Sequence, residues 1–168
     1  LSLCNNLIIT LGLETNHNAL WVFTLNPAKK ARDEHGSGRV AASIGPQNAS
    51  YRPDICPPAE AAEKLYSEII SYLAPECDVL LIETMSSIDQ AEGALRAAIK
   101  GGKPVWIGLT VDDFDGRKLR SGENLTDIKA TLDAYSPEAV LINCSRPEAV
   151  SDVVNILADF GYQFGAYA

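Results

Sequence analysis

Four short apolar runs recur along the chain at similar intervals, and this repeat constrains the fold more than any other feature of the sequence. The runs begin near residues 79, 105, 139 and 164. Such intervals are typical of a βαβ unit, in which about 30 residues supply a strand, a crossover helix and the next strand. Crossover helices between consecutive strands make those strands parallel, so the pattern predicts an α/β protein. The spacing fits both a doubly wound sheet and a (β/α) barrel.

The segments around these runs carry further strand and helix signals. Val40–Ser43 is an apolar run ended by a Gly-Pro turn, and it predicts an earlier strand. Two capping boxes predict helix starts, one at Ser87 with Gln90 and one at Ser145 with Glu148. Apolar residues at helical spacing predict a helix behind a Pro-Pro pair: Ala61, Leu65, Ile69 and Leu73. A further helix is predicted through Leu125, Ile128 and Leu132.

The first 38 residues follow no such repeat. Residues 6–10 fit a strand, and residues 28–34 fit the end of a helix that stops before His35. His17 and His35 fall in loops or at helix ends, without a nearby acid at metal-ligand spacing, and we expect both on the surface. Nothing in the chain resembles a linker, so residues 1–168 are predicted to form a single domain.

The charge and the apolar patterning exclude two classes of partner. The chain has 14 basic and 22 acidic residues, a formal net charge of −8. Nucleic acids and anionic membranes bind broad basic faces, so neither is expected as a partner. No apolar run approaches the roughly 20 residues of a membrane helix. The cysteines (Cys4, Cys56, Cys77 and Cys144) match no zinc-finger or disulfide pattern, and we interpret them as reduced thiols of a cytosolic protein.

Polar side chains follow the predicted strands, and in parallel α/β folds such strand ends meet on one face. This rule selects Ser43, Glu83, Thr84, Thr110, Asp112, Asn143, Cys144 and Ser145. Glu83 fits either an active-site carboxylate or an acid that complements a helix dipole. Cys144 begins a predicted helix, where a thiolate is favoured, and it fits a nucleophile, a metal ligand or a small buried residue. Residues 117–120 form a basic cluster, either solvated or in contact with an anionic group.

Six segments carry a resemblance to a known family. They are Ala42–Pro46, Ser50–Asp54, Glu83–Ser87, Lys118–Glu123, Ile142–Ala149 and Phe164–Ala168. In their order and spacing over residues 39–168 they resemble the homocysteine S-methyltransferase family, in its stand-alone, sulfonium-using branch. The resemblance implies a zinc-dependent (β/α) TIM-barrel enzyme of the cytoplasm. Its substrates would be homocysteine and a small methyl donor, and its product methionine.

The resemblance also implies roles for individual residues. Cys144 matches a cysteine that ligates zinc after the sixth strand of the family barrel. Glu83 matches the glutamate that holds the amino group of homocysteine after the fourth strand. Thr84 and Asn143, next to these two residues, are expected to bind the substrate as well. The sequence does not select the donor among S-methylmethionine, S-adenosylmethionine, betaine and a methyl-folate.

Two family features are missing from this sequence. The other zinc ligands are an adjacent cysteine pair after the last strand, and the sequence ends before that stretch; the early Asp-Gly motif is also absent. A chain of 168 residues is shorter than the roughly 250 of a closed barrel. We therefore expect an incomplete barrel, from about the second to the seventh strand. Its open sheet edges predict self-association.

Two other interpretations stay open at this point. One is a catalytically inactive barrel fragment that folds or self-associates without metal, which the missing cysteine pair favours. The other is an unrelated α/β enzyme that uses Glu83 as a base and Cys144 as a covalent nucleophile.

Overall fold

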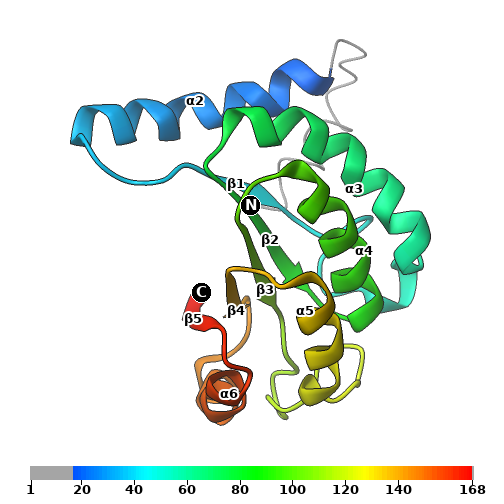
Figure 1. The fold of residues 1–168 in the computed structure, drawn as a ribbon. Coiled ribbons are helices and arrows are strands. Elements are labelled where there is room, and N and C mark those ends of the chain that lie inside the picture. Colours follow the sequence, from blue (N-terminus) through cyan, green and yellow to red (C-terminus); the bar gives the residue numbers. More distant parts are fainter. Residues whose placement is uncertain (1–16, 168) are drawn as a thin grey trace.

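The computed structural model describes residues 17–167, with side chains from residue 25 onward. Strands and helices alternate along this part of the chain (Figure 1). The helices and strands are α2 (His17–His35), β1 (Ala41–Ile44), α3 (Ala59–Leu73), β2 (Val79–Met85), α4 (Ile88–Ala98), β3 (Val105–Leu109), α5 (Lys129–Tyr135), β4 (Ala139–Asn143), α6 (Pro147–Asp159) and β5 (Gln163–Tyr167). Short 3₁₀ turns are η1 (Pro53–Ile55), η2 (Ala74–Glu76), η3 (Ile99–Gly101) and η4 (Leu125–Ile128). Within the described residues, we find no helix with the length and apolarity needed to cross a membrane.

The order of the strands decides between the two folds that the sequence leaves open. One five-stranded sheet has the order β1-β2-β3-β4-β5, and each neighbouring pair is parallel. A doubly wound sheet reverses its strand order at a switch point, whereas the wall of a (β/α) barrel keeps the chain order. The sheet is therefore a barrel wall, and the predicted parallel α/β fold with an incomplete barrel is confirmed.

The strands begin close to their predicted positions, at residues 41, 79, 105, 139 and 163. If Glu83 ends the fourth strand, as the resemblance implies, then β1 to β5 correspond to the third to seventh strands of the family barrel. The strand predicted over residues 6–10 lies outside the described residues. The helix expected to stop before the His35-Gly36 pair is α2, which ends at His35.

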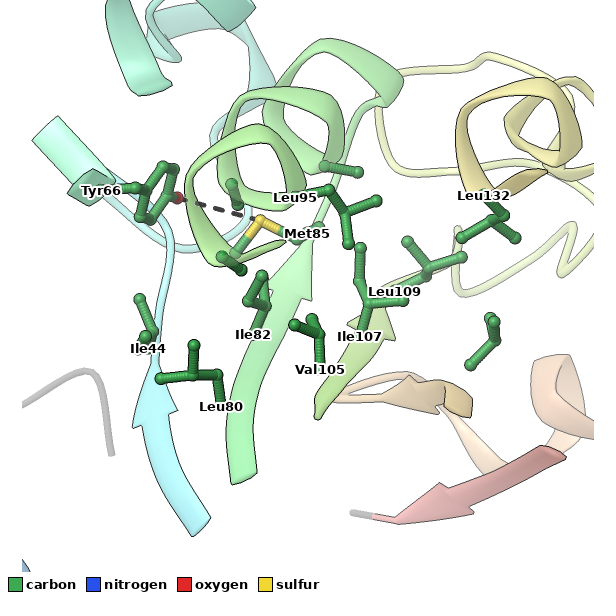
Figure 2. Close-up of a cluster of buried hydrophobic side chains, with 14 of the residues drawn as sticks. Ile44, Tyr66, Leu80, Ile82, Met85, Leu95, Val105, Ile107, Leu109 and Leu132 are labelled. Carbon is green, nitrogen blue, oxygen red and sulfur yellow. Dashed lines mark hydrogen bonds between the residues drawn. The ribbon is translucent and has the colours of Figure 1, made fainter. Parts of the chain in front are cut away.

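The core lies between the sheet and the helices that cover its outer side. In Figure 1, α3, α4 and α5 follow one another along this side of the curved sheet. Figure 2 shows the side chains of Leu80, Ile82, Ile107 and Leu109 pointing toward these helices, and all four are fully buried. Burial of one such side chain contributes about 1.5–3 kcal/mol. Leu81, which alternates with Leu80 and Ile82, is only half-buried, so the inner face of the sheet is covered less than the outer face.

The helix α3 forms where predicted, but most of the residues whose spacing predicts it lie outside its buried face. Ala61 is exposed and Leu65 is 46% exposed. The buried residues of α3 are Ala59, Ala62, Tyr66, Ile70 and Leu73. The two faces differ by about one residue, and both repeat at helical spacing. The aromatic ring of Tyr66 decides between them, because it is fully buried with its hydroxyl against the Met85 sulfur (Figure 2).

The two predicted capping boxes have different outcomes. Ser87 caps α4, since its hydroxyl accepts from the backbone N–H of Gln90 at 3.2 Å. The Gln90 side chain accepts from the backbone N–H of Ser86 instead of returning to Ser87. The box at Ser145 is wrong, because Arg146 is the N-cap of α6 and has no side-chain cap. The Ser145 hydroxyl is used by the strand ends described below.

Candidate functional site

The Glu83 carboxylate is buried at the carboxyl end of β2. Only 7% of the residue is exposed, and it lies where the register between β2 and β3 shifts between Ile82 and Met85. Such a bulge redirects side chains at a strand end. Glu83 is not in the first turn of α4, whose acidic residue is Asp89. Its Oε1 accepts from the Ser43 hydroxyl of β1, and its Oε2 accepts from the Tyr167 hydroxyl of β5 at 2.6 Å.

Thr84 and Asn143 join the ends of β2 and β4 by two reciprocal hydrogen bonds. The Thr84 backbone N–H donates to Asn143 Oδ1 at 3.0 Å, and Asn143 Nδ2 donates to Thr84 Oγ1 at 2.9 Å. Both side chains are buried, which makes this pair costly to break. Thr84 has a φ of 66° and Cys144 a φ of 53°. Residues other than glycine rarely adopt this left-handed conformation, which stores strain of about 1–3 kcal/mol at each position.

The Cys144 sulfur is surrounded by hydrogen-bond donors. Thr84 Oγ1 and Asn143 Nδ2 each lie 3.5 Å from it. A hydrogen bond to Cys144 and burial raise the pKa of Tyr51 to about 12. Burial and a hydrogen bond to Glu83 raise the pKa of Tyr167, whose hydroxyl lies 2.6 Å from the Glu83 carboxylate. The arrangement therefore brings the predicted residues Glu83, Thr84, Asn143 and Cys144 together at one end of the barrel wall; with Ser43 and Tyr167 we call them the strand-end cluster.

Arg120 borders the strand-end cluster and is not a solvated residue. Its guanidinium donates to Thr110 Oγ1 at 2.9 Å and to the Cys144 carbonyl at 3.0 Å. It also pairs with Asp113, whose pKa it lowers by a hydrogen bond. The Arg120 guanidinium stacks 4.8 Å from the centre of the Tyr51 ring. Interpreting residues 117–120 as a solvated cluster is thus wrong for Arg120, because four hydrogen bonds join its guanidinium to other groups of the fold.

The remaining strand-end candidates have structural contacts. The Ser145 hydroxyl accepts from the Val111 backbone N–H at 2.9 Å and lies 3.3 Å from Thr110 Oγ1, which ties the ends of β3 and β4 together. Asp112 Oδ1 accepts from two backbone N–H groups of its own turn, and Asp112 does not join the cluster. His35 is exposed at the end of α2. The side chain of His17 lies outside the described side chains.

Gly108 of β3 makes room for the strand-end cluster. A Cβ atom at this position would lie 2.9 Å from Asn143 Oδ1 and 3.3 Å from the Tyr167 hydroxyl. The sequence analysis missed Gly108, and it did not select Tyr51 or Tyr167 as site residues. An isolated glycine inside a strand is the signal that could have found the first, because it marks a close approach. Tyr167 could have been found by the same strand-end rule that selected Glu83.

The described residues do not form a zinc site by themselves. Among residues 17–167, no group of three or more His, Cys, Asp or Glu side chains is placed to hold a metal ion. A catalytic zinc site takes three protein ligands. Cys77 is buried near the start of β2, and Cys56 accepts a hydrogen bond from Gln90 Nε2. Even with Cys144 as one ligand, the described residues offer no set of three ligands around its sulfur.

The fold and the strand-end cluster define a (β/α)-barrel protein with a polar site at the carboxyl ends of its strands. A model of the homocysteine S-methyltransferase family matches residues 8–168, and the chain belongs to this family. No curated protein matches the chain in sequence.

Solved structures with the same fold include two forms of the homocysteine methyltransferase MmuM from Escherichia coli. The metallated form has a TM-score of 0.72 and 21% identity, over 89% of this chain and 65% of that one. The apo form has a TM-score of 0.70 and 20% identity, over 89% of this chain and 66% of that one. The chain thus spans about two thirds of the length of these relatives. At 20–21% identity, the similarity to them shows a shared fold.

Replacing Gly108 by alanine tests whether the cluster needs the open space above β3. Gly108→Ala is expected to lower the free energy of unfolding by about 1–3 kcal/mol, because the new methyl group overlaps Asn143. The control is Gly45→Ala, whose Cβ would meet no atom within 4 Å; it should change stability by less than about 1 kcal/mol. Urea unfolding measures both, and equal stability of the two variants would contradict this packing.

Proposed function

We propose that this chain forms the homocysteine-binding part of an enzyme that transfers a methyl group to the thiol of homocysteine, giving methionine. The donor would be a sulfonium compound or a related methyl donor. Membership of the family supports this proposal. The observation that carries it is the buried Glu83 carboxylate next to Thr84, which contacts the Cys144 sulfur. An amino-acid thiol carries a positively charged ammonium group at one end, which an anionic side chain can bind. Its sulfur lies at the other end and needs a second binding position.

Glu83 would hold the amino group of the substrate. A carboxylate that is largely removed from water interacts strongly with an ammonium group, because the local dielectric is low and the hydrogen bond is charge-assisted. Thr84 and Asn143 would line the path from this carboxylate to the sulfur. Their hydrogen bonds to each other fix that wall before any substrate arrives, and such preorganisation reduces the cost of orienting the thiol.

The reaction requires the substrate sulfur as a thiolate. Its electron pair forms a bond to the methyl carbon, while the bond from that carbon to the donor's positively charged sulfur or nitrogen breaks. The leaving atom keeps the electron pair and becomes neutral. Zinc, when bound to such a thiol, favours the thiolate at neutral pH. We propose Cys144 as one zinc ligand, and the described residues supply no set of three ligands around it.

Replacing Glu83 by glutamine tests the amino-group role. Affinity for L-homocysteine should fall about ten- to hundred-fold, since hydrogen bonds to charged groups contribute about 1.5–3 kcal/mol. Affinity for 4-mercaptobutanoate, which is homocysteine without its amino group, should change less than about two-fold. Titration calorimetry of the zinc-supplemented full-length protein measures both.

The matched control is Glu148→Gln in α6, because the Glu148 side chain is 75% exposed and pairs only with Arg146 at 3.8 Å among the ion pairs described. It should bind both ligands like the unmodified protein. Unchanged homocysteine binding by Glu83→Gln would contradict the proposal. No homocysteine binding by the unmodified protein would favour the inactive barrel segment instead.

We also propose that the 168-residue chain alone self-associates through its sheet edges. Within the described residues, β1 pairs only with β2, and β5 only with β4. Phe164 of β5 is 45% exposed, and an apolar open edge favours pairing with another copy. Equilibrium sedimentation should find dimers or larger species, and Phe164→Lys should shift them toward monomer. A stable monomer of the unmodified chain would contradict this proposal.

We place the protein in the cytoplasm. The described cysteines Cys56, Cys77 and Cys144 are all free, which supports a reducing compartment. Recovery of the protein from the secreted fraction of cells would contradict this assignment.

A further inference from the structure

The Glu83 carboxylate is held from two sides of the barrel wall. Ser43 of the neighbouring strand β1 donates its hydroxyl to one carboxylate oxygen. Tyr167 of β5 donates its hydroxyl to the other oxygen at 2.6 Å, over a separation of 84 residues. With one donor on each oxygen, the carboxylate cannot rotate about its terminal bond without losing both hydrogen bonds.

Tyr167 reaches Glu83 across two intervening strands. In the sheet order, β3 and β4 lie between β2 and β5. The Tyr167 hydroxyl therefore passes over β3 on the inner face of the wall, where Gly108 has no side chain to block it. The contact depends on the curvature of the sheet, which brings non-neighbouring strand ends together as in a closed barrel.

The two hydroxyls compensate the buried Glu83 carboxylate for the water that it loses in the fold. Burial disfavours an ionised carboxylate unless hydrogen-bond donors compensate for the lost water. Burial and the hydrogen bond to Glu83 raise the pKa of Tyr167, so this side chain stays a donor at neutral pH. An ionised carboxylate offers about four acceptor positions. The two hydroxyls occupy two of them and leave the others for an ammonium group.

We propose that Tyr167 and Ser43 are positioning residues that fix the Glu83 carboxylate, so that the site selects thiols carrying an α-ammonium group. This inference rests on the proposed function, because it presumes that Glu83 receives the amino group of the substrate. Neither hydroxyl needs to touch the substrate. Their effect should therefore appear in the preference for ligands with an amino group, and not in the binding of the thiol itself.

The test compares Tyr167→Phe with a matched control. Tyr162→Phe removes a hydroxyl that donates to Asp133 Oδ1 at 2.9 Å, in contact with a carboxylate outside the strand-end cluster. Calorimetry on the zinc-supplemented full-length protein uses L-homocysteine and 4-mercaptobutanoate. Tyr167→Phe should weaken homocysteine binding about ten-fold and leave the analogue within about two-fold. Tyr162→Phe should leave both unchanged.

Substitutions of Ser43 provide a second readout. Ser43→Ala should weaken homocysteine binding in the same selective way, and Ser43→Thr, which retains the hydroxyl, should restore the preference. Suppose that the unmodified protein binds homocysteine more tightly than the analogue. The inference is then overturned if Tyr167→Phe weakens the binding of both ligands equally, or if it changes neither affinity. If the unmodified protein itself shows no preference for homocysteine over the analogue, the proposed role of Glu83 fails and this inference fails with it.

Discussion

The amide of Asn143 joins two strands that are not neighbours in the sheet, and the geometry of the candidate site depends on this bridge. Asn143 lies at the end of β4 and makes two hydrogen bonds to Thr84 at the end of β2. Gly108 of the intervening strand β3 leaves the space for this contact. Thr84 is adjacent in sequence to Glu83, and Asn143 to Cys144. One side-chain amide therefore sets the position of both the carboxylate and the sulfur. The strained left-handed conformations of Thr84 and Cys144 persist because the bridge is buried and fully hydrogen-bonded.

The parallel sheet and its strand positions were predictable from the sequence, because continuous apolar runs separated by helix signals leave few other folds. The strand-end rule also selects Glu83, Thr84, Asn143 and Cys144 without any use of the family resemblance. Both predictions use local patterns that act along one segment at a time. The family assignment then fixed the barrel type, and the sequential strand order agrees with it.

The features that local patterns do not predict all arise from contacts between segments far apart in the chain. The Ser145 hydroxyl accepts a hydrogen bond from the Val111 backbone N–H instead of capping α6. Arg120, within a basic run that resembled a solvated loop, turns inward to the Cys144 carbonyl. The buried face of α3 depends on which residues meet the sheet, and periodicity alone does not fix that phase. The strand-end rule can place Tyr167 at the site, but no local pattern predicts that its hydroxyl pairs with Glu83, 84 residues away.

If the proposed function holds, Glu83 and Cys144 face one substrate from the same end of the barrel. A crystal structure of the full-length protein with L-homocysteine bound would test this arrangement. We expect the amino nitrogen within about 3.2 Å of a Glu83 carboxylate oxygen, with the thiol sulfur directed toward Cys144. An amino acid bound elsewhere, or one whose amino group contacts a different residue while Glu83 keeps only its two hydroxyl partners, would contradict it.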